Sequence, residues 1–314
     1  MPGVVAALQA EYAYTGTFYW NIRPATHRVC IRQGGVCMKT PSLHRALGAV
    51  PSTLLIPLAA RAFGDAMFPK HALGDGWAAQ TAQQLDVDLR HFLRDPASVY
   101  GVLARTAILR QLARDFFALH PRATGANLGC GLSHYFQWLD TGHNHWLDAD
   151  CPEVMALRDR VLPTHVARLQ HASMDLRDDQ WWDQLGLAPS RRRHAPQFLI
   201  CEGVLMYLEP DQVHAVLQAF GERAPTGSEL NFDVMGWMTT GWAQLHPSVR
   251  HTGAQFRWGV RSMGELTAAH SRLRLLAEYS VMDGYGYPYS VLWPTLRALY
   301  GVPFYGVVRM GVAD

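Results

Sequence analysis

Hydrophobic positions follow one spacing in the first part of the chain and another in the rest. From Ser52 to Leu119, apolar residues recur three and four positions apart, which is typical of helices that pack by one face. Beyond Gly125, short apolar segments alternate with segments of helical spacing. The predicted strands lie near residues 126–129, 145–149, 198–202 and 229–234, and one more ends near residue 173. The predicted helices lie near residues 101–119, 133–140, 152–162 and 210–223.

Strands and helices that alternate in this way predict an α/β fold with a doubly wound, mostly parallel sheet. Two further strands, at about 275–282 and 303–309, flank a loop rich in Gly, Tyr and Pro at 283–290. The segment from Ser262 to Glu265 has the pattern of a capping box that opens another helix. We therefore expect N-terminal helices in residues 51–120 and the α/β core in residues 121–314.

Residues 1–50 differ from both parts because they show no clear periodicity, and we treat them as an N-terminal extension of uncertain structure. Met38 precedes the more regular sequence. One hypothesis therefore places the native start at Met38, with the preceding residues as an upstream translation. The intact mass of the protein expressed from its own gene tests this hypothesis.

The composition is that of an ordinary globular protein, with 49% hydrophobic and 17% charged residues. Lys and Arg number 28 against 26 Asp and Glu, so the charge gives no reason to expect a nucleic-acid or membrane partner. The five cysteines have no metal-ligand spacing, and we expect no metal site. Without an apolar run long enough to span a membrane or a signal-peptide pattern, we expect a cytoplasmic location.

A glycine turn after the first predicted strand carries the first chemical signal. The segment Ala126-Asn127-Leu128-Gly129-Cys130-Gly131 places two glycines after an apolar strand, and Asp148 and Asp150 follow the next strand. In nucleotide-binding sheets, such glycines let the backbone approach a ligand, and the acid accepts hydrogen bonds from a ribose diol. The spacing alone is also compatible with a simple tight turn, and it does not choose between the two acids.

Two more carboxylates follow predicted strands. Asp175, with Leu176, lies where the third strand ends; it suits a contact with an adenine, or equally the N-cap of a helix at Trp181-Trp182. Glu202 follows the apolar segment 198–201 directly. Because buried acids are rare without a partner, we favour a functional role for Glu202 beside a cationic ligand group.

Arginine and aromatic residues supply two weaker signals. Arg105 lies within the long predicted helix, where solvent exposure is the simpler interpretation, although an arginine facing the sheet would clamp a carboxylate. The segment from Arg250 to Gly259 mixes Arg, aromatic residues and Gly. It suits a substrate wall or a structural plug equally well.

Three blocks together resemble one methyltransferase family. The blocks are Asn127 to Leu132, Asp148 to Val154, and Glu202 to Leu208. They are similar to the signatures of the leucine carboxyl methyltransferases and of the bacterial O-methyltransferases of tetracenomycin type. Arg158 with Val161-Leu162-Pro163, and Thr252 to Gly259, resemble the bacterial branch most closely, and the resemblance covers about residues 52–309.

The resemblance implies a seven-stranded class I methyltransferase sheet with an N-terminal helical lid and S-adenosyl-L-methionine as cofactor. It implies that Arg105 holds the cofactor carboxylate and that Gly129, with Gly131, lines the amino-acid end. It further implies that Asp150 takes the ribose hydroxyls, that Asp175 and Leu176 frame the adenine, and that Glu202 approaches the amino group or the sulfonium.

The chain departs from the family after Leu132, where Ser133-His134-Tyr135 replaces the usual Asp-Thr-Arg. If the methyl acceptor is a phenol, a general base is useful, and His134, His251 and Tyr207 are the candidates. If the acceptor is a carboxylate, it is already ionised at neutral pH and needs no base.

The prediction is therefore an O-methyltransferase that acts on a carboxylate or phenolic hydroxyl of a small polyketide-like or aromatic metabolite. The alternatives are a methyltransferase of a protein C-terminal carboxylate, an NAD-dependent dehydrogenase, and a catalytically degenerate cofactor-binding scaffold. The dehydrogenase fingerprint requires a third glycine where this chain has His134. The identity of the acceptor and the oligomeric state stay open.

Overall fold

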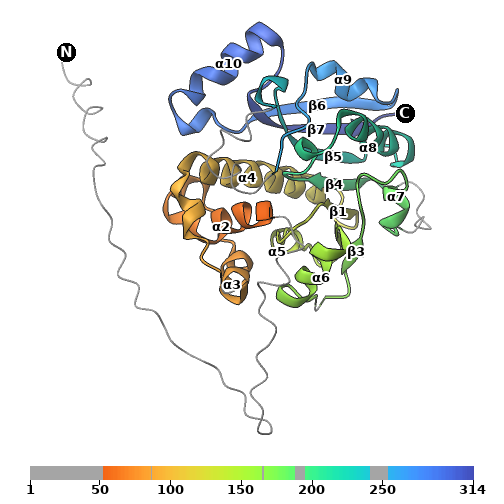
Figure 1. Ribbon diagram of the computed structural model, residues 1–314. Coiled ribbons are helices and arrows are strands. Elements are labelled where there is room, and N and C mark those ends of the chain that lie inside the picture. The colour runs from red at the N-terminus through yellow and green to blue at the C-terminus, as the bar shows by residue number, and fades with distance from the viewer. Residues whose placement is uncertain (1–51, 86, 165, 188–194, 241–253) are drawn as a thin grey trace, which may run out of the picture. The chain divides into compact units, whose positions relative to one another are not determined.

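A single mixed sheet forms the centre of the protein in the computed structural model, which describes residues 52–314 except 86, 165, 188–194 and 241–253 (Figure 1). Its strands are β1 (Thr124–Leu128), β2 (His145–Asp150), β3 (Leu169–Ser173), β4 (Gln197–Cys201), β5 (Glu229–Met235), β6 (Leu273–Ser280) and β7 (Tyr305–Val312). The spatial order is β3-β2-β1-β4-β5-β7-β6, and β7 alone among these strands runs antiparallel to both of its neighbours. The predicted doubly wound, mostly parallel sheet is thus confirmed.

The direction of winding reverses between β1 and β4, which pair with each other in parallel. Asn127 of β1 lies opposite Asp148 of β2 on one side and Ile200 of β4 on the other. In open α/β sheets, ligands bind beyond the carboxyl ends of the strands at such a reversal. The topology therefore places the predicted site beyond Leu128, Asp150 and Cys201.

Successive side chains of β4 belong to two cores on opposite faces of the sheet. Leu199 packs in the same core as Phe220, and Phe198 packs in the core that contains Phe116. A strand that is buried on both faces is a continuous apolar run in the sequence. This explains why the central strands could be predicted although their apolar and polar residues do not alternate strictly. Phe116 belongs to α4 (Pro96–Leu119) and Phe220 to α8 (Pro210–Arg223), so these helices cover opposite faces of the sheet.

The remaining helices are α2 (Leu55–Phe63), α3 (Gly76–Leu85), α5 (Phe136–Leu139), α6 (Pro152–Val161), α7 (Trp181–Gln184), α9 (Met263–Ala268) and α10 (Tyr289–Tyr300). Short 3-10 turns lie at Ser52–Leu54, Gly64–Ala66, Pro69–His71, Arg90–Arg94, Leu205–Tyr207, Trp237–Thr239 and Asp283–Tyr285. Figure 1 shows α2 and α3, in orange, beside α4, while α10, in blue, stands at the β6–β7 end of the sheet.

Three predicted elements differ from the structure. Helix α4 begins at Pro96, because Asp95 caps it by accepting a hydrogen bond from the Ser98 N–H at 3.3 Å. The predicted capping box does not form at α9: the Ser262 side chain makes no cap bond, and Glu265 accepts the Arg261 N–H instead. Helix α10 was not predicted, although Tyr289, Leu292 and Leu296 recur at helical spacing; Pro294 lies inside the helix and interrupts the pattern.

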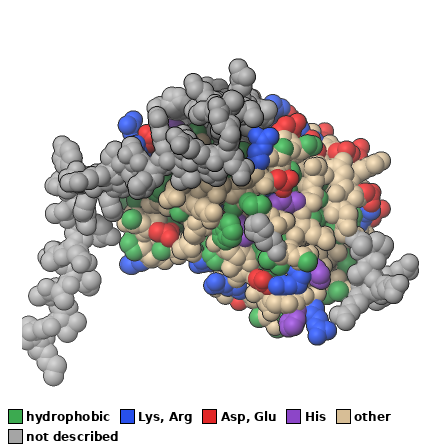
Figure 2. Space-filling view, turned by 90° about the horizontal axis from the view of Figure 1, so that it is seen from below, with side chains coloured by type: hydrophobic (Ala, Val, Ile, Leu, Met, Phe, Trp, Pro, Cys, Tyr) green, Lys and Arg blue, Asp and Glu red, His purple; other side chains and the backbone are tan. Residues whose placement is uncertain are grey.

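Two surface properties bear on possible partners. On the face shown in Figure 2, lysine and arginine side chains are scattered and form no continuous basic patch. Among the described residues, no helix is both long and apolar enough to cross a membrane, and no group of three potential ligands could hold a metal ion. The hypothesis about Met38 falls outside the described residues.

Candidate active site

A cavity of about 860 Å³ opens beyond the carboxyl ends of the parallel strands. Gly129 after β1, Asp150 at the end of β2, Glu202 after β4 and Met235 at the end of β5 all line it. Helices α2 and α4 contribute Arg61 and Arg105 from the N-terminal layer. The size falls within the range that holds a small molecule with most of its surface buried.

The turn after β1 uses glycine for its conformation and for space. Gly129 and Gly131 have φ values of +65° and +51°, which side-chain-bearing residues rarely adopt. A Cβ atom at Gly129 would lie 2.5 Å from the Val204 Cγ2 atom, and one at Gly131 would lie 2.8 Å from the Leu54 Cδ2 atom. Backbone rather than side chain therefore faces the cavity at this turn.

Asp150 holds this turn in place. Its Oδ2 atom accepts a hydrogen bond from the Gly131 N–H at 2.8 Å, and its Oδ1 atom accepts one from the Cys151 N–H at 2.7 Å. Burial raises the pKa of Asp150, and these two N–H donors act against that rise. The carboxylate lies at the edge of the cavity with lone pairs left to accept further donors.

Asp148 serves a different purpose. It is fully buried, pairs with the guanidinium of Arg158, and accepts a hydrogen bond from the Trp146 Nε1–H at 2.9 Å. Arg158 also donates to the carbonyl oxygens of Gly131 at 3.0 Å and Ser133 at 2.6 Å. Asp148 and Arg158 thus brace the glycine turn from behind, and of the two acids Asp150 is the one that lines the cavity.

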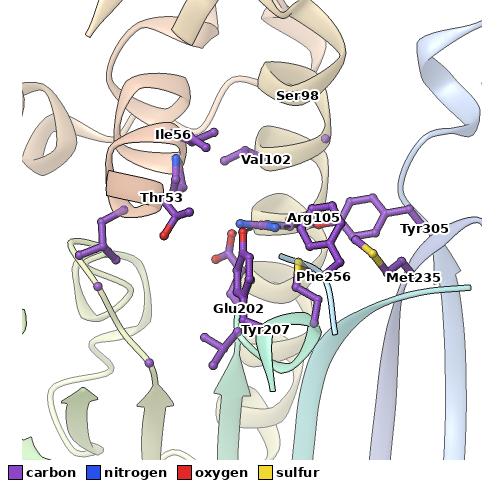
Figure 3. A pocket seen from close by; sticks show the side chains of 18 of the residues that line it. Thr53, Ile56, Ser98, Val102, Arg105, Glu202, Tyr207, Met235, Phe256 and Tyr305 are labelled. Atoms are coloured by element: carbon purple, nitrogen blue, oxygen red, sulfur yellow. Dashed lines mark hydrogen bonds and ion pairs between the residues drawn. The ribbon is translucent and has the colours of Figure 1, made fainter. Parts of the chain in front are cut away.

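Glu202 lies at the centre of a buried polar network (Figure 3). Its Oε1 atom accepts hydrogen bonds from Arg105 Nε and Thr106 Oγ1, both at 2.8 Å, and its Oε2 atom accepts the Tyr135 hydroxyl at 2.6 Å. Burial alone would raise the pKa of Glu202, but the charge of Arg105, with further help from these hydroxyl donors, brings it below the usual value. Glu202 is therefore an anion.

Asp233 and Tyr305 complete the network on the other side of Arg105. Arg105 Nη1 donates to Asp233 Oδ2 at 3.1 Å and to the Tyr305 hydroxyl at 2.7 Å, and that hydroxyl donates to Asp233 Oδ2 at 2.8 Å. Asp233 Oδ1 accepts the Gly203 N–H at 2.6 Å. Sequence reasoning missed both residues, although an aspartate inside the apolar strand 229–234 was a signal for Asp233.

Sequence comparison decides the family. Residues 53–221 match the model of the leucine carboxyl methyltransferases. The chain is also 30% identical over 239 residues to the tetracenomycin polyketide synthesis O-methyltransferase TcmP of Streptomyces glaucescens, covering 76% of this chain and 85% of that protein. This chain belongs to the leucine carboxyl methyltransferase family.

The fold agrees with this membership. The structure of a methyltransferase candidate from Thermobifida fusca YX superposes with a TM-score of 0.54 at 17% identity, covering 89% of this chain and all of that one. The predicted class I methyltransferase fold is confirmed. Membership also establishes S-adenosylmethionine as the cofactor and excludes the NAD-dependent dehydrogenase.

The structure places the residues predicted to bind the cofactor in two groups. Those that line the cavity are Arg105, Gly129, Gly131, Asp150 and Glu202. Asp175 and Leu176 follow β3 at the same edge of the sheet but do not line the cavity. Leu176 packs in the core, and Asp175 pairs with Arg177, which lines the cavity in its place. The alternative role of Asp175 as the cap of α7 is wrong, because Gln180 holds that position.

The three candidate bases differ in where they lie relative to the cavity. The ring of His134 packs 4.9 Å from that of Trp77 and does not line the cavity, and burial lowers the pKa of His134 to about 4. Tyr207 lines the cavity, but burial raises its pKa to about 12. His251 lies outside the described residues, as does Thr252.

Apolar side chains form the wall of the cavity on the side of β5 and β7. Its members are Met206, Met235, Phe256, Met282, Leu292 and Phe304. Tyr207 packs against Phe256 with ring centroids 5.7 Å apart. In Figure 3, Phe256, Met235 and Tyr305 lie on the opposite side of Arg105 from Thr53 and Ile56. This wall, with few charges beyond Arg105, favours an apolar or aromatic ligand.

Proposed function

We propose that this methyltransferase transfers the methyl group to a carboxylate oxygen of a small, largely apolar aromatic or polyketide-like metabolite. The observation that carries the choice of a carboxylate is the lack of a histidine on the described cavity surface. Glu202 accepts three hydrogen bonds, and Tyr207, with its pKa raised to about 12, keeps its proton at neutral pH.

The charges around Glu202 suit the amino-acid end of the cofactor. Arg61 and Arg105 stand against Asp75, Glu202 and Asp233, so two positive and three negative groups leave a formal charge of −1. S-adenosylmethionine carries one net positive charge, from a sulfonium, an ammonium and a carboxylate. The cluster is therefore complementary to the cofactor in both sign and composition.

When bound, S-adenosylmethionine would supply an activated methyl group, to which the acceptor oxygen bonds in line as the carbon–sulfur bond breaks and S-adenosylhomocysteine leaves. In the proposed arrangement, Asp150 accepts the ribose hydroxyls and the turn at Gly129 lies against the chain of the methionine part. Glu202 accepts the ammonium, and Arg105 holds Glu202 in position. The apolar wall excludes water from the acceptor side, so positioning and desolvation supply the rate enhancement.

The relatives support the same chemistry. The family is described by carboxyl methylation, and TcmP is an O-methyltransferase of polyketide synthesis. A phenolic hydroxyl is the second candidate acceptor; it requires a base, and the described lining residues include no histidine to supply one. The relatives do not distinguish a small metabolite from a protein C-terminus, and the apolar wall is the reason for preferring the metabolite.

The test is methyl transfer from labelled S-adenosylmethionine to matched pairs of aromatic carboxylic acids and phenols. A methyl ester releases labelled methanol in mild alkali, whereas a methyl ether does not. Label released by alkali supports the proposal, and stable label identifies a phenol as acceptor. Tight binding of S-adenosylhomocysteine without transfer to any compound, including C-terminal peptides, would point to the scaffold instead.

A further inference from the structure

Gly101 lies in the second turn of α4, is buried and lines the cavity. Glycine weakens a helix interior relative to alanine, because it has more backbone freedom to lose on folding. A left-handed backbone is the usual reason for keeping a glycine, but Gly101 has the φ of an ordinary helical residue. The reason for this glycine must therefore lie in the space around it.

The space beside Gly101 belongs mostly to the cavity. A Cβ atom at this position would lie 3.3 Å from the Met282 Sδ atom and 3.8 Å from the Tyr305 Cε1 atom. Apart from the backbone of its own helix and its two chain neighbours, no other atom of the described residues would lie within 4 Å. Met282 and Tyr305 themselves line the cavity, and a methionine side chain adapts easily. A methyl group would therefore fit at position 101, and a larger side chain would extend into the cavity.

Gly221 on α8 shows the opposite case. It is also a buried helical glycine, but it does not line the cavity. A Cβ atom at Gly221 would lie 2.6 Å from the Cβ atom of His270 and 2.8 Å from its Cγ atom. Packing of the protein against itself thus requires glycine at position 221, whereas at position 101 the protein leaves the space unfilled.

Gly101 borders the part of the cavity proposed for the acceptor. The Gly129 turn, Asp150 and Glu202, proposed to contact the cofactor, lie at the ends of β1, β2 and β4, whereas the two neighbours of Gly101 lie at β7 and after β6, at one end of the sheet. One turn further along α4, Arg105 reaches Glu202 after β4 and Tyr305 on β7, and so lies between these two parts (Figure 3). A side chain at position 101 would therefore enter the acceptor part, beside the apolar wall.

The connection between β6 and β7 is fixed against α4 by a series of aromatic contacts. Phe304 and Tyr289, which both line the cavity, have ring centroids 5.7 Å apart. Tyr289 packs against Tyr285 at 5.4 Å, and Tyr285 packs against Tyr100 of α4 at 5.2 Å. The wall is thus held at a set distance from the helix, so added volume at Gly101 would be taken from the ligand.

We propose that Gly101 determines the size of the acceptor. The acceptor is a fused-ring aromatic carboxylate whose rings lie along the α4 backbone at Gly101, against Met282, Tyr289 and Phe304. A cavity of about 860 Å³ is near the upper end of the range for small ligands, and fused rings fill an apolar space that a single ring leaves partly empty. This inference deepens the proposed function and rests on it.

The experiment measures methyl transfer from labelled S-adenosylmethionine to benzoic acid, 2-naphthoic acid and anthracene-2-carboxylic acid. We expect the wild type to have its highest kcat/KM with the fused-ring acids. Gly101→Val should lower kcat/KM for anthracene-2-carboxylic acid by about 10- to 100-fold more than for benzoic acid, because one or two extra carbons in an apolar pocket discriminate by about this factor. Gly101→Ala should give an intermediate ratio. Affinity for S-adenosylhomocysteine should stay within about twofold in both variants.

Thermal unfolding separates this role from a role in packing. Gly101→Ala should unfold at the same temperature as the wild type or higher, because alanine favours the helix and its methyl group fits. Gly221→Ala is the matched control: it should unfold at a lower temperature and keep the wild-type preference among the three acids. Gly101→Ala also keeps the test decisive if the branched valine impairs folding.

The remaining outcomes overturn the proposal. Equal losses for all three acids, or a lower unfolding temperature for Gly101→Ala, would show that Gly101 serves packing. A wild type that prefers benzoic acid would exclude an acceptor that fills this part of the cavity. Transfer to none of the acids would refute the proposed carboxylate acceptor; transfer to 2-naphthol instead would contradict only the carboxylate, and a size preference lost in Gly101→Val would still support Gly101.

Discussion

The two sides of the cavity are assembled from different distances along the chain. On the β1–β2 side, Asp150 reaches the Gly131 N–H, 19 residues away. On the β4–β7 side, Arg105 reaches Glu202, Asp233 and Tyr305, which lie 97, 128 and 200 residues away. The first side orders backbone around Asp150, the acid proposed to bind the ribose, and the second compensates buried charges with one another. We therefore expect ligand affinity to depend most on the first side and fold stability on the second.

The largest expected effect is on the β4–β7 side. Glu202→Gln removes one of the two anions that compensate Arg105, and a buried ion pair broken at one partner costs about 3 kcal/mol or more. Denaturant unfolding measures this loss. Asp183→Asn is the control, because the Asp183–Arg223 pair is solvent-exposed and should contribute less than about 1 kcal/mol. Equal losses in the two variants would contradict the contrast between a buried network and a surface pair.

The next effect concerns acid sensitivity on the β1–β2 side. The pKa of His134 is lowered to about 4 in the folded protein. Between about pH 6.5 and 4, this histidine is therefore protonated in the unfolded chain but not in the folded protein. Stability should therefore fall as the pH drops through this window, by up to about 3 kcal/mol. In His134→Gln this part of the pH dependence should disappear. An unchanged pH dependence in the variant would assign the acid sensitivity to other groups.

Asp150→Ala tests the ligand side directly. It removes the acceptor proposed for the ribose hydroxyls, and hydrogen bonds to a charged group predict a loss of S-adenosylhomocysteine affinity of about 10- to 100-fold. Calorimetric titration measures the loss. Asp150→Asn, which keeps an acceptor for the Gly131 N–H, should retain more affinity than Asp150→Ala. Full affinity in both variants would remove Asp150 from the site.

Tyr207→Phe should have the smallest effect. The tyrosine lines the cavity, but with a pKa raised to about 12 it stays protonated near neutral pH. We expect kcat in the labelled-methyl assay to change less than about fivefold, with any change mainly in the KM of the acceptor. A general base would lose about 100-fold or more. A loss of that size, together with a steeper pH profile in the wild type, would restore Tyr207 as a base.

Local patterns were sufficient for the ends of the parallel strands that border the cavity. The ends of β1, β2 and β4, the glycine turn and the positions of Asp150 and Glu202 all followed from apolar segments that end in glycine or acid. Each of these features is encoded within about 20 residues, because a strand, a turn and the next strand are contiguous in an α/β unit. The family resemblance then chose Asp150 over Asp148, and the burial of Asp148 supplies the physical reason.

The polar network could not be predicted in the same way. In the sequence, Arg61 looks like an ordinary helical arginine, and only the folded structure places Asp75 against it. Tyr305 looks like an ordinary first residue of a strand, and only the folded structure shows its hydrogen bonds with Arg105 and Asp233. These features depend on contacts between distant elements, which the order of residues alone does not reveal.

One consequence concerns the order of the two sides along the chain. The family match ends at residue 221, within α8, whereas Met235, Phe256, Leu292 and Phe304 of the apolar wall all follow it. A chimera joined within α8 would keep the half proposed to bind the cofactor and take most of the apolar wall, proposed to face the acceptor, from a relative. Such a graft would have to retain aspartate and tyrosine at positions 233 and 305, because both engage Arg105 across the junction. If the wall sets the acceptor preference as proposed, that preference would be transferred with residues 222–314.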